Sequence, residues 1–263
     1  MKVKVAILTS DHFRHKYFVN TVAKTHEVVG VVAEEKSFQP AKYAENEQDE
    51  AIIRNHFHLR DIEEKKAFDA EFNSAIDVLS LPPKSVNAQK VLNYLLHKNP
   101  DYLFVYGTGI IGREVIEAFN GRIINMHLGL SPYYRGAGTN FYPIVNGEPE
   151  YCGVTIHFLD AGIDSGDIIS RGKAVINEND NPHTLGCRII KVGIKLIIES
   201  VEKIKQSSFT PEKQNLSIGK VYYRKDFDAQ KVLTAYNNIE KGLFRDYVHK
   251  QYAVLKEVLV YEI

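Results

Sequence analysis

Two short β-branched runs separated by a helical stretch open this chain, and they constrain its fold more than any other feature. Residues 3–8 and 28–33 (VVGVVA) are predicted as buried strands, with a helix over residues 13–24 between them. This βαβ order is typical of a parallel sheet covered by helices on its faces. We therefore predict an α/β fold, a doubly wound, mostly parallel sheet of the Rossmann-like type.

The rest of the chain extends this pattern. The charged stretch at about 45–72 has apolar residues at helical spacing, which predicts one or two surface helices inserted between core units. Ser85 is predicted to cap the next helix. We expect a catalytic domain over residues 1–206 and a small C-terminal domain over 207–263. Further strands are predicted at 78–81, 102–106, 122–125, 153–159, 168–171 and 258–261, and helices at 85–97, 113–119, 183–205 and 229–237.

Composition excludes several classes of protein. The 33 Lys and Arg residues balance the 33 Asp and Glu residues, which disfavours a strong nucleic-acid binder. Cys152 and Cys187 form neither a disulfide framework nor a CxxC motif. No signal peptide is visible, and no segment approaches the roughly 18 apolar residues of a membrane span. We expect a cytoplasmic protein that binds no nucleic acid, membrane or metal, with a homodimer as its assembly.

The strongest candidate site lies at the end of the strand over 122–125. Asn125 and His127 are two residues apart and face the same side. Open parallel sheets bind ligands beyond the carboxyl ends of their strands. Asp164, in an Asp-Ser-Gly turn, can complete a polar trio suited to a developing oxyanion and a moving proton. Taken singly, each residue is more often structural: a strand end, a core histidine and a turn residue.

The ordered motifs around the trio resemble the folate-dependent formyltransferase family. That family includes glycinamide ribonucleotide formyltransferase, methionyl-tRNA formyltransferase and the sugar N-formyltransferases. The spacing from His127 to Asp164 is close to that of the family. The matching elements are Asn125 and His127, Ser131-Pro132 with Arg135-Gly136, Gly153-Val154-Thr155-Ile156-His157, and Asp164-Ser165-Gly166.

This resemblance implies formyl transfer from N10-formyltetrahydrofolate. Asn125 and a protonated His127 would stabilise the anion formed when an amine attacks the formyl carbon. Asp164 would orient the imidazole and raise its pKa, and either His127 or Asp164 would be the final base. His157 is expected to support these groups rather than react.

The family match also implies a donor site. The loop beside the pterin ring would be Tyr106, Gly107, Thr108, Gly109, Ile110 and Ile111, with Leu159, Asp160 and Gly162 as the opposite wall. Glycines allow a flat heterocycle to approach the backbone. The alternative for the first loop is a plain strand-to-helix turn.

The acceptor is less constrained. The segment over residues 9–16, directly after the first strand, contains no glycine, whereas the glycinamide ribonucleotide enzymes carry a glycine-rich phosphate loop there. The modest length after Pro211 and the zero net charge argue against tRNA. We expect a nucleotide-linked amino sugar, with a product used in lipopolysaccharide or other surface glycan synthesis. Three groups of residues are candidates for the acceptor site. Ser10, His12, Arg14 and Lys16 either bind an anion or are solvated, and Tyr222 and Tyr223 either stack on a base or fill a core. The third group is Ser131 and Arg135.

Several alternatives remain open at this stage. The same trio can deformylate the folate by using water, or formylate another small amine. A non-catalytic folate- or nucleotide-binding module is a further class, which the intact trio disfavours. His56 and His58 form a His-x-His pair that we interpret as a helix surface rather than a metal site.

Overall fold

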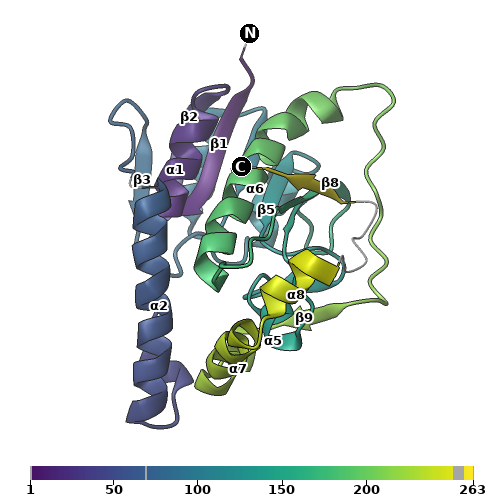
Figure 1. Ribbon diagram of the computed structural model, residues 1–263. Coiled ribbons are helices and arrows are strands. Elements are labelled where there is room, and N and C mark those ends of the chain that lie inside the picture. The colour runs from purple at the N-terminus through teal and green to yellow at the C-terminus, as the bar shows by residue number, and fades with distance from the viewer. Residues whose placement is uncertain (1, 69, 251–257, 263) are drawn as a thin grey trace.

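The computed structural model describes residues 2–68, 70–250 and 258–262 (Figure 1). Its main sheet has the strand order β10-β8-β7-β5-β4-β1-β2-β3. The strands from β3 to β5 run parallel, whereas β7 is antiparallel to both β5 and β8. The strands are β1 (Lys4–Ser10), β2 (Glu27–Glu34), β3 (Val78–Leu81), β4 (Tyr102–Val105), β5 (Ile123–His127), β7 (Val154–Phe158), β8 (Ile168–Ala174) and β10 (Leu259–Tyr261).

Helices cover both faces of this sheet, because buried side chains alternate along the central strands. On one face, α1 (Phe13–Val22) and α6 (Pro182–Ile204) pack over Val5 and Ile7. On the other face, α3 (Gln89–Lys98) and α4 (Arg113–Ala118) pack over Ala6 and Leu8. The doubly wound α/β fold predicted from the sequence is therefore confirmed.

The local signals at helix starts are mixed. Asn181 caps α6 by accepting from the N–H groups of His183 and Thr184, and the Thr184 hydroxyl accepts from the Asn181 N–H. The predicted cap at Ser85 is wrong. The helix begins at Gln89, after an Ala88 that makes no side-chain cap. The Ser85 N–H instead donates to Glu34, at 2.6 Å.

The charged insertion forms one long helix, α2 (Glu47–Phe68), after the short 3-10 turn η1 (Pro40–Tyr43). In Figure 1 it extends well beyond the sheet. It is not a pure surface helix, because Ile53, His56 and Glu64 are buried. This face packs against α1, α6 and α7 (Ala229–Glu240). Contact with a helix far along the chain overrode the polar character of the segment.

Beyond α6, the chain runs along one side of the molecule to β9 (Lys220–Tyr222) (Figure 1). Strand β9 pairs with β6 (Tyr134–Gly136), and β10 joins the main sheet beside β8. These contacts tie the C-terminal elements to the residues before 206, and the domain boundary there stays a prediction. The remaining elements are α5 (Tyr142–Asn146), η2 (Pro149–Tyr151), η3 (Arg224–Asp226) and α8 (Leu243–Lys250).

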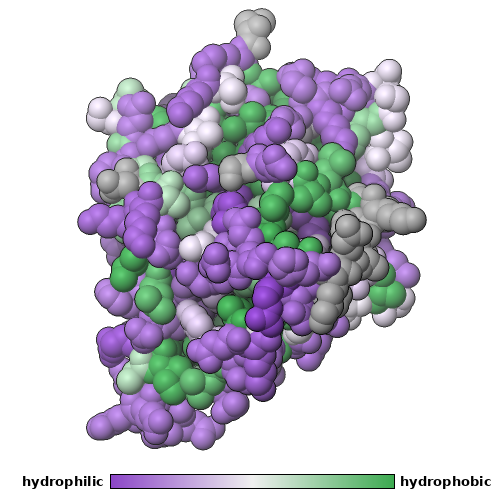
Figure 2. Space-filling view, viewed as in Figure 1, coloured by the Kyte–Doolittle hydropathy of each residue, from purple (hydrophilic) through white to green (hydrophobic). Residues whose placement is uncertain are grey.

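The surface is mainly polar. Figure 2 shows hydrophilic residues over most of one face, with an apolar patch where the lower ends of α2 and α7 meet. Within the described residues, no helix combines the length and the apolar character needed to cross a bilayer.

Candidate active site

The carboxyl end of β5 carries the two side chains at the centre of the site. Ile124 and Met126 belong to the apolar core on one face of the sheet. Because side chains alternate along a strand, Asn125 and His127 project from the other face. Asn125 is half-buried, and His127 is 6% exposed. The edge of the sheet at which they lie is where parallel α/β folds bind ligands.

Asp164 reaches this pair from the loop between β7 and β8. Its backbone is left-handed, with φ at 46°, which is unusual for a residue other than glycine. One carboxylate oxygen, Oδ2, accepts from the Gly136 N–H at 2.8 Å and lies 3.2 Å from His127 Nδ1. The other oxygen, Oδ1, lies 3.4 Å from Asn125 Nδ2. The structure thus brings together all three predicted catalytic residues.

His157 belongs to the same cluster. The antiparallel pairing of β5 and β7 places it directly opposite Asn125. Its Nδ1–H donates to the Phe158 carbonyl at 2.8 Å, so its Nε2 accepts from the Asn125 amide at 3.0 Å. This amide is thereby fixed with its nitrogen toward His157 and Asp164. His157 contacts Asn125 and Asp164, and its supporting role stays a prediction.

Burial sets the charge state of the trio. It lowers the pKa of His127, and the nearby Asp164 carboxylate and Tyr134 carbonyl offset this only in part, while His157 and Arg135 lower it further. Burial would raise the pKa of Asp164, but His127, His157 and the Gly136 N–H together hold it well below its usual range. Asp164 is therefore ionised near neutral pH. His127 has an acceptor at each ring nitrogen, the Asp164 carboxylate and the Tyr134 carbonyl, and its protonation stays a prediction.

The second ring nitrogen of His127 is also engaged. His127 Nε2 donates to the Tyr134 carbonyl at 2.9 Å, and Nδ1 faces the Asp164 carboxylate across 3.2 Å. Ser131 lies in the connecting loop, where its N–H donates to Thr155 Oγ1 at 2.9 Å and its peptide bond to Pro132 is cis. The Ser131 hydroxyl is buried without a partner among the described residues.

The predicted donor loop follows β4 and has a shaped backbone. Gly107 adopts φ of 70°, and a Cβ there would lie 2.6 Å from the His15 ring, so this position requires glycine. The Thr108 hydroxyl donates to the Gly109 carbonyl at 2.8 Å. Tyr106 and Ile111 are buried, whereas Ile110 is 85% exposed.

Asn87 holds this loop from α3's N-terminal side, and the sequence did not single it out. Its amide donates to the Ile110 carbonyl at 2.8 Å and accepts from the Gly112 N–H at 2.6 Å. Such an amide clasp has no signature in a single sequence, because Asn87 is 23 and 25 positions away from its partners.

The predicted opposite wall is a turn stabilised by its own side chains. Asp160 accepts from the Ser165 hydroxyl at 2.8 Å and from the Gly162 N–H at 3.0 Å. The Leu159 N–H donates to the Ile123 carbonyl at 2.9 Å, which anchors the turn to β5. These residues therefore shape the loop that carries Asp164, and a role in binding the folate stays a prediction.

The residues predicted to bind an anion at the start of α1 have protein partners instead. Arg14 pairs with Glu64 of α2 at 2.8 Å, and Lys16 pairs with Glu71. Ser10 is fully buried, and its hydroxyl donates to Asp11 at 3.1 Å. His12 is partly buried at the helix N-terminus, and burial lowers its pKa. Arg14 and Lys16 therefore have carboxylate partners in the charged stretch at about 45–72, and their role in binding the acceptor stays a prediction.

The two predicted stacking tyrosines have different environments. Tyr222 is buried and stacks on Tyr142, with ring centroids 3.9 Å apart, so it fills a core and is not available for a base. Tyr223 is 49% exposed. Arg135 is 8% exposed, and its guanidinium contacts the Leu216 carbonyl at 3.5 Å.

His56 contradicts its assignment to a helix surface. It is buried against His183, with ring centroids 4.6 Å apart, and both histidines contact the Tyr236 hydroxyl. Burial lowers the pKa of His56 to about 4, so the ring is neutral. His58, in contrast, is exposed.

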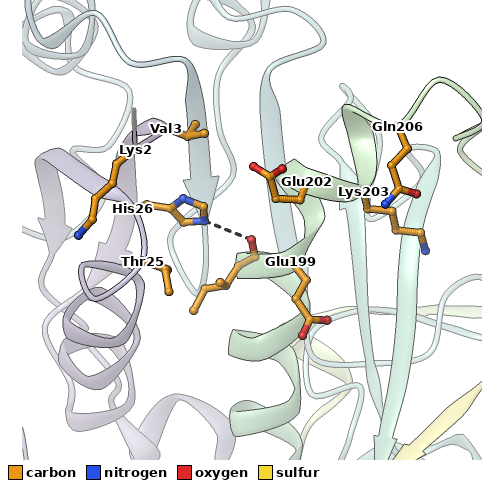
Figure 3. A pocket seen from close by; sticks show the side chains of 9 residues that line it. Lys2, Val3, Thr25, His26, Glu199, Glu202, Lys203 and Gln206 are labelled. Carbon is orange, nitrogen blue, oxygen red and sulfur yellow. Dashed lines mark hydrogen bonds between the residues drawn. The ribbon is translucent and has the colours of Figure 1, made fainter.

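One cavity lies away from this chemistry. An open hollow of about 870 Å³ is lined by Lys2, Val3, Thr25 and His26 and by residues of the C-terminal half of α6 (Figure 3). These first four residues precede β1 and β2, so the hollow is at the amino ends of the strands, opposite His127. Parallel α/β sheets bind ligands at the other edge, and we do not assign the active site to this cavity.

The chain was compared with known proteins. The model of the formyl transferase family matches residues 1–201. The methionyl-tRNA formyltransferase of Thermodesulfovibrio yellowstonii is 31% identical over 163 residues, which are 62% of this chain and 52% of that protein. The chain thus spans about half the length of this curated relative.

Two solved structures show the same fold. The phosphoribosylglycinamide formyltransferase from Anaplasma phagocytophilum has a TM-score of 0.56 at 14% identity, covering 85% of this chain and 100% of that chain. A formyltransferase from Anoxybacillus kamchatkensis has a TM-score of 0.51 at 22% identity, covering 87% of this chain and 97% of that chain. The second was determined in complex with UDP-4,6-dideoxy-4-formamido-L-AltNAc and tetrahydrofolate.

Proposed function

Because this chain belongs to the formyl transferase family, we propose that it transfers a formyl group from N10-formyltetrahydrofolate to a substrate amine. The observation that carries this proposal is the convergence of Asn125, His127 and Asp164 at the carboxyl end of β5. An amide donor and an imidazole that each lie within 3.5 Å of one ionised carboxylate suit acyl transfer to nitrogen.

The reaction exchanges one carbon–nitrogen bond for another. The amine attacks the formyl carbon, its new bond forms, and the carbonyl oxygen becomes an anion. Collapse of this intermediate breaks the bond to N10 of the folate. The proton that the amine loses is balanced by the proton that N10 gains, so tetrahydrofolate leaves as a neutral amine.

Asn125 is the donor for the anion in this proposal. Its amide hydrogen toward Asp164 spans 3.4 Å, a long contact, whereas the one toward His157 spans 3.0 Å. We expect the Asn125 amide to give up its long contact with Asp164 and to donate to the oxyanion instead, because catalytic hydrogen bonds often tighten only in the reacting complex.

His127 and Asp164 act together as the proton acceptor. His127 Nδ1 lies 3.2 Å from the carboxylate, so a proton between them is shared by both groups. The Tyr134 carbonyl then accepts from the other ring nitrogen of the resulting imidazolium. Asp164 alone is a weak base, because its pKa is held so low.

We propose a nucleotide-linked amino sugar as the acceptor. The solved neighbour from Anoxybacillus kamchatkensis holds a UDP-linked formamido sugar with tetrahydrofolate. The zero net charge of this chain suits a small acceptor better than a nucleic acid. The half-exposed Tyr223 is the aromatic residue free to meet a base.

Methionyl-tRNA is the second candidate acceptor. One observation favours it: the curated relative at 31% identity is a methionyl-tRNA formyltransferase. An electrostatic tRNA site would make turnover fall steeply with salt, whereas a nucleotide-sugar site would respond weakly.

The experiment is a comparison of acceptors with one donor. Purified protein and N10-formyltetrahydrofolate are incubated with UDP- and dTDP-amino sugars, methionyl-tRNA, glycinamide ribonucleotide or no acceptor. We expect tetrahydrofolate release only with an amino sugar, together with a product heavier by one formyl group. Release without any acceptor would identify a hydrolase, and turnover of methionyl-tRNA alone would refute the sugar assignment.

A further inference from the structure

The segment between α6 and β9 passes beside the loop that carries Asp164. Glu212 forms a two-way backbone bridge with Ile168, at the start of β8: the Ile168 N–H donates at 2.8 Å and the Glu212 N–H donates at 2.9 Å. An ion pair between Arg171 and Glu212 adds to this anchor. The bridge fixes the segment two residues before Gln214.

Gln214 reaches from this anchor to the backbone of the catalytic turn. Its Nε2 donates to the Asp164 carbonyl at 2.9 Å and to the Gly166 carbonyl at 2.6 Å. The two carbonyls belong to the Asp-Ser-Gly turn, in which Asp164 has its left-handed backbone. Gly166 is tightly fitted there, since a Cβ would lie 1.8 Å from the Phe158 carbonyl oxygen.

We propose that Gln214 is a positioning residue for catalysis, because its side-chain amide holds the turn that aims the Asp164 carboxylate at His127. This inference rests on the proposed formyl transfer. Gln214 lies beyond residues 1–201, which match the family, so a residue of the C-terminal segment supports the family's motif.

The geometry makes the catalytic site sensitive to this clasp. The Asp164 carboxylate contacts Asn125, His127 and His157 at 3.2 to 3.5 Å, and all three partners lie on β5 or β7. A shift of the turn would change all three distances. A displacement of about 1 Å at a reacting group typically costs about 100-fold in rate.

Two substitutions separate donation from packing. Gln214→Glu keeps the shape but replaces the donor with a carboxylate that faces two carbonyl oxygens. Gln214→Leu removes the polar group. Gln230→Glu, at an exposed position of α7, is the matched control. We expect both Gln214 variants to lose roughly 10- to 100-fold in kcat, with KM for both substrates within about threefold and the control unchanged.

A second readout does not depend on turnover. The His127 ring is followed by NMR of the full chain with labelled histidine as pH varies. Asp164 raises the pKa of His127, against burial, His157 and Arg135, so a displaced carboxylate lowers that pKa further in both variants. A merely structural role would reduce the melting temperature without moving this titration.

Each outcome bears on the proposal. Wild-type kcat together with an unchanged His127 titration in Gln214→Glu would overturn it, and this variant decides if Gln214→Leu does not fold. Should the wild-type protein formylate none of the acceptors, the proposed function fails by itself. The His127 titration would then still test whether Gln214 positions Asp164.

Discussion

Replacing Asn125 with alanine tests the proposed chemistry most directly. In the folded protein, this change removes one hydrogen bond of ordinary length to His157, at 3.0 Å, and one long contact to Asp164, at 3.4 Å. The free energy of unfolding should fall by about 1 to 3 kcal/mol, the cost of leaving a buried acceptor without its donor. In the transition state, loss of one oxyanion donor costs about 3 kcal/mol, or roughly 100- to 1000-fold in kcat.

These two effects are separable by experiment. Turnover is measured at saturating acceptor, well below the melting temperature, and stability is measured by urea denaturation. Asn146→Ala is the matched control. The Asn146 amide also donates twice, to the hydroxyls of Tyr134 and Tyr222 at 2.9 Å each. These two tyrosines form a buried cluster with Tyr142.

Asn146 is exposed, so we expect Asn146→Ala to lose less stability than Asn125→Ala and to keep its kcat within a fewfold of wild type. Asn125→Ala should lose both stability and turnover. If Asn125→Ala retained kcat within a fewfold, the oxyanion would have another donor, and the role given to Asn125 would be refuted.

Three further predictions concern charge and backbone. The pKa of His127 lies below its ordinary value of 6.5, so kcat/KM should stay flat as pH falls through 6.5. Asp164→Asn should move the fall of kcat/KM in acid to still lower pH, and a fall that begins above pH 6.5 would contradict this. Glu64→Ala should lower the free energy of unfolding in urea by about 3 to 5 kcal/mol, because the Glu64 carboxylate is 3% exposed and neutralises Arg14. Glu71 is 81% exposed and pairs with Lys16, so Glu71→Ala should cost at most about 1 kcal/mol, and equal losses would refute the buried-pair argument. Gly136→Ala should disrupt the β6–β9 pairing, because a Cβ there would lie 2.1 Å from the Tyr222 carbonyl oxygen. Gly147 has a similar positive φ but open space around it, so Gly147→Ala should cost only about 1 to 2 kcal/mol by thermal melting. Similar losses in the two variants would show that the contact with Tyr222 does not matter.

The parts of the fold that were predicted correctly are those written in local patterns. The β-branched runs over 3–8 and 28–33 became β1 and β2, because a strand buried on both faces must be apolar throughout. The Asn125/His127 pair was identifiable because a strand's period of two places both side chains on one face. The family was recognisable from ordered short motifs, and the match over residues 1–201 confirms it.

Other expectations failed where a distant segment changed the surroundings of a residue. Arg14 was interpreted as either an anion ligand or a solvated residue, and α2 instead places Glu64 beside it, 50 positions later in the chain. Tyr222 was a candidate base-stacking residue, but Tyr142 covers it. His56 lay in a charged, apparently exposed helix, but α6 and α7 bury it. No local pattern records which face of a helix another element will cover.

By itself, the sequence determined most strands and helices of the main sheet domain, the face on which Asn125 and His127 project, and the family. Only the tertiary structure decided the hydrogen bonds and the electrostatic environment of the site. The β5–β7 register brings His157 to Asn125, burial lowers the pKa of His127, and the Gln214 amide donates to the turn that carries Asp164. The physical reason is the range of the interactions: periodicity and turn chemistry act over a few residues, whereas burial, ion pairing and the aim of a carboxylate depend on segments that meet only in the folded chain.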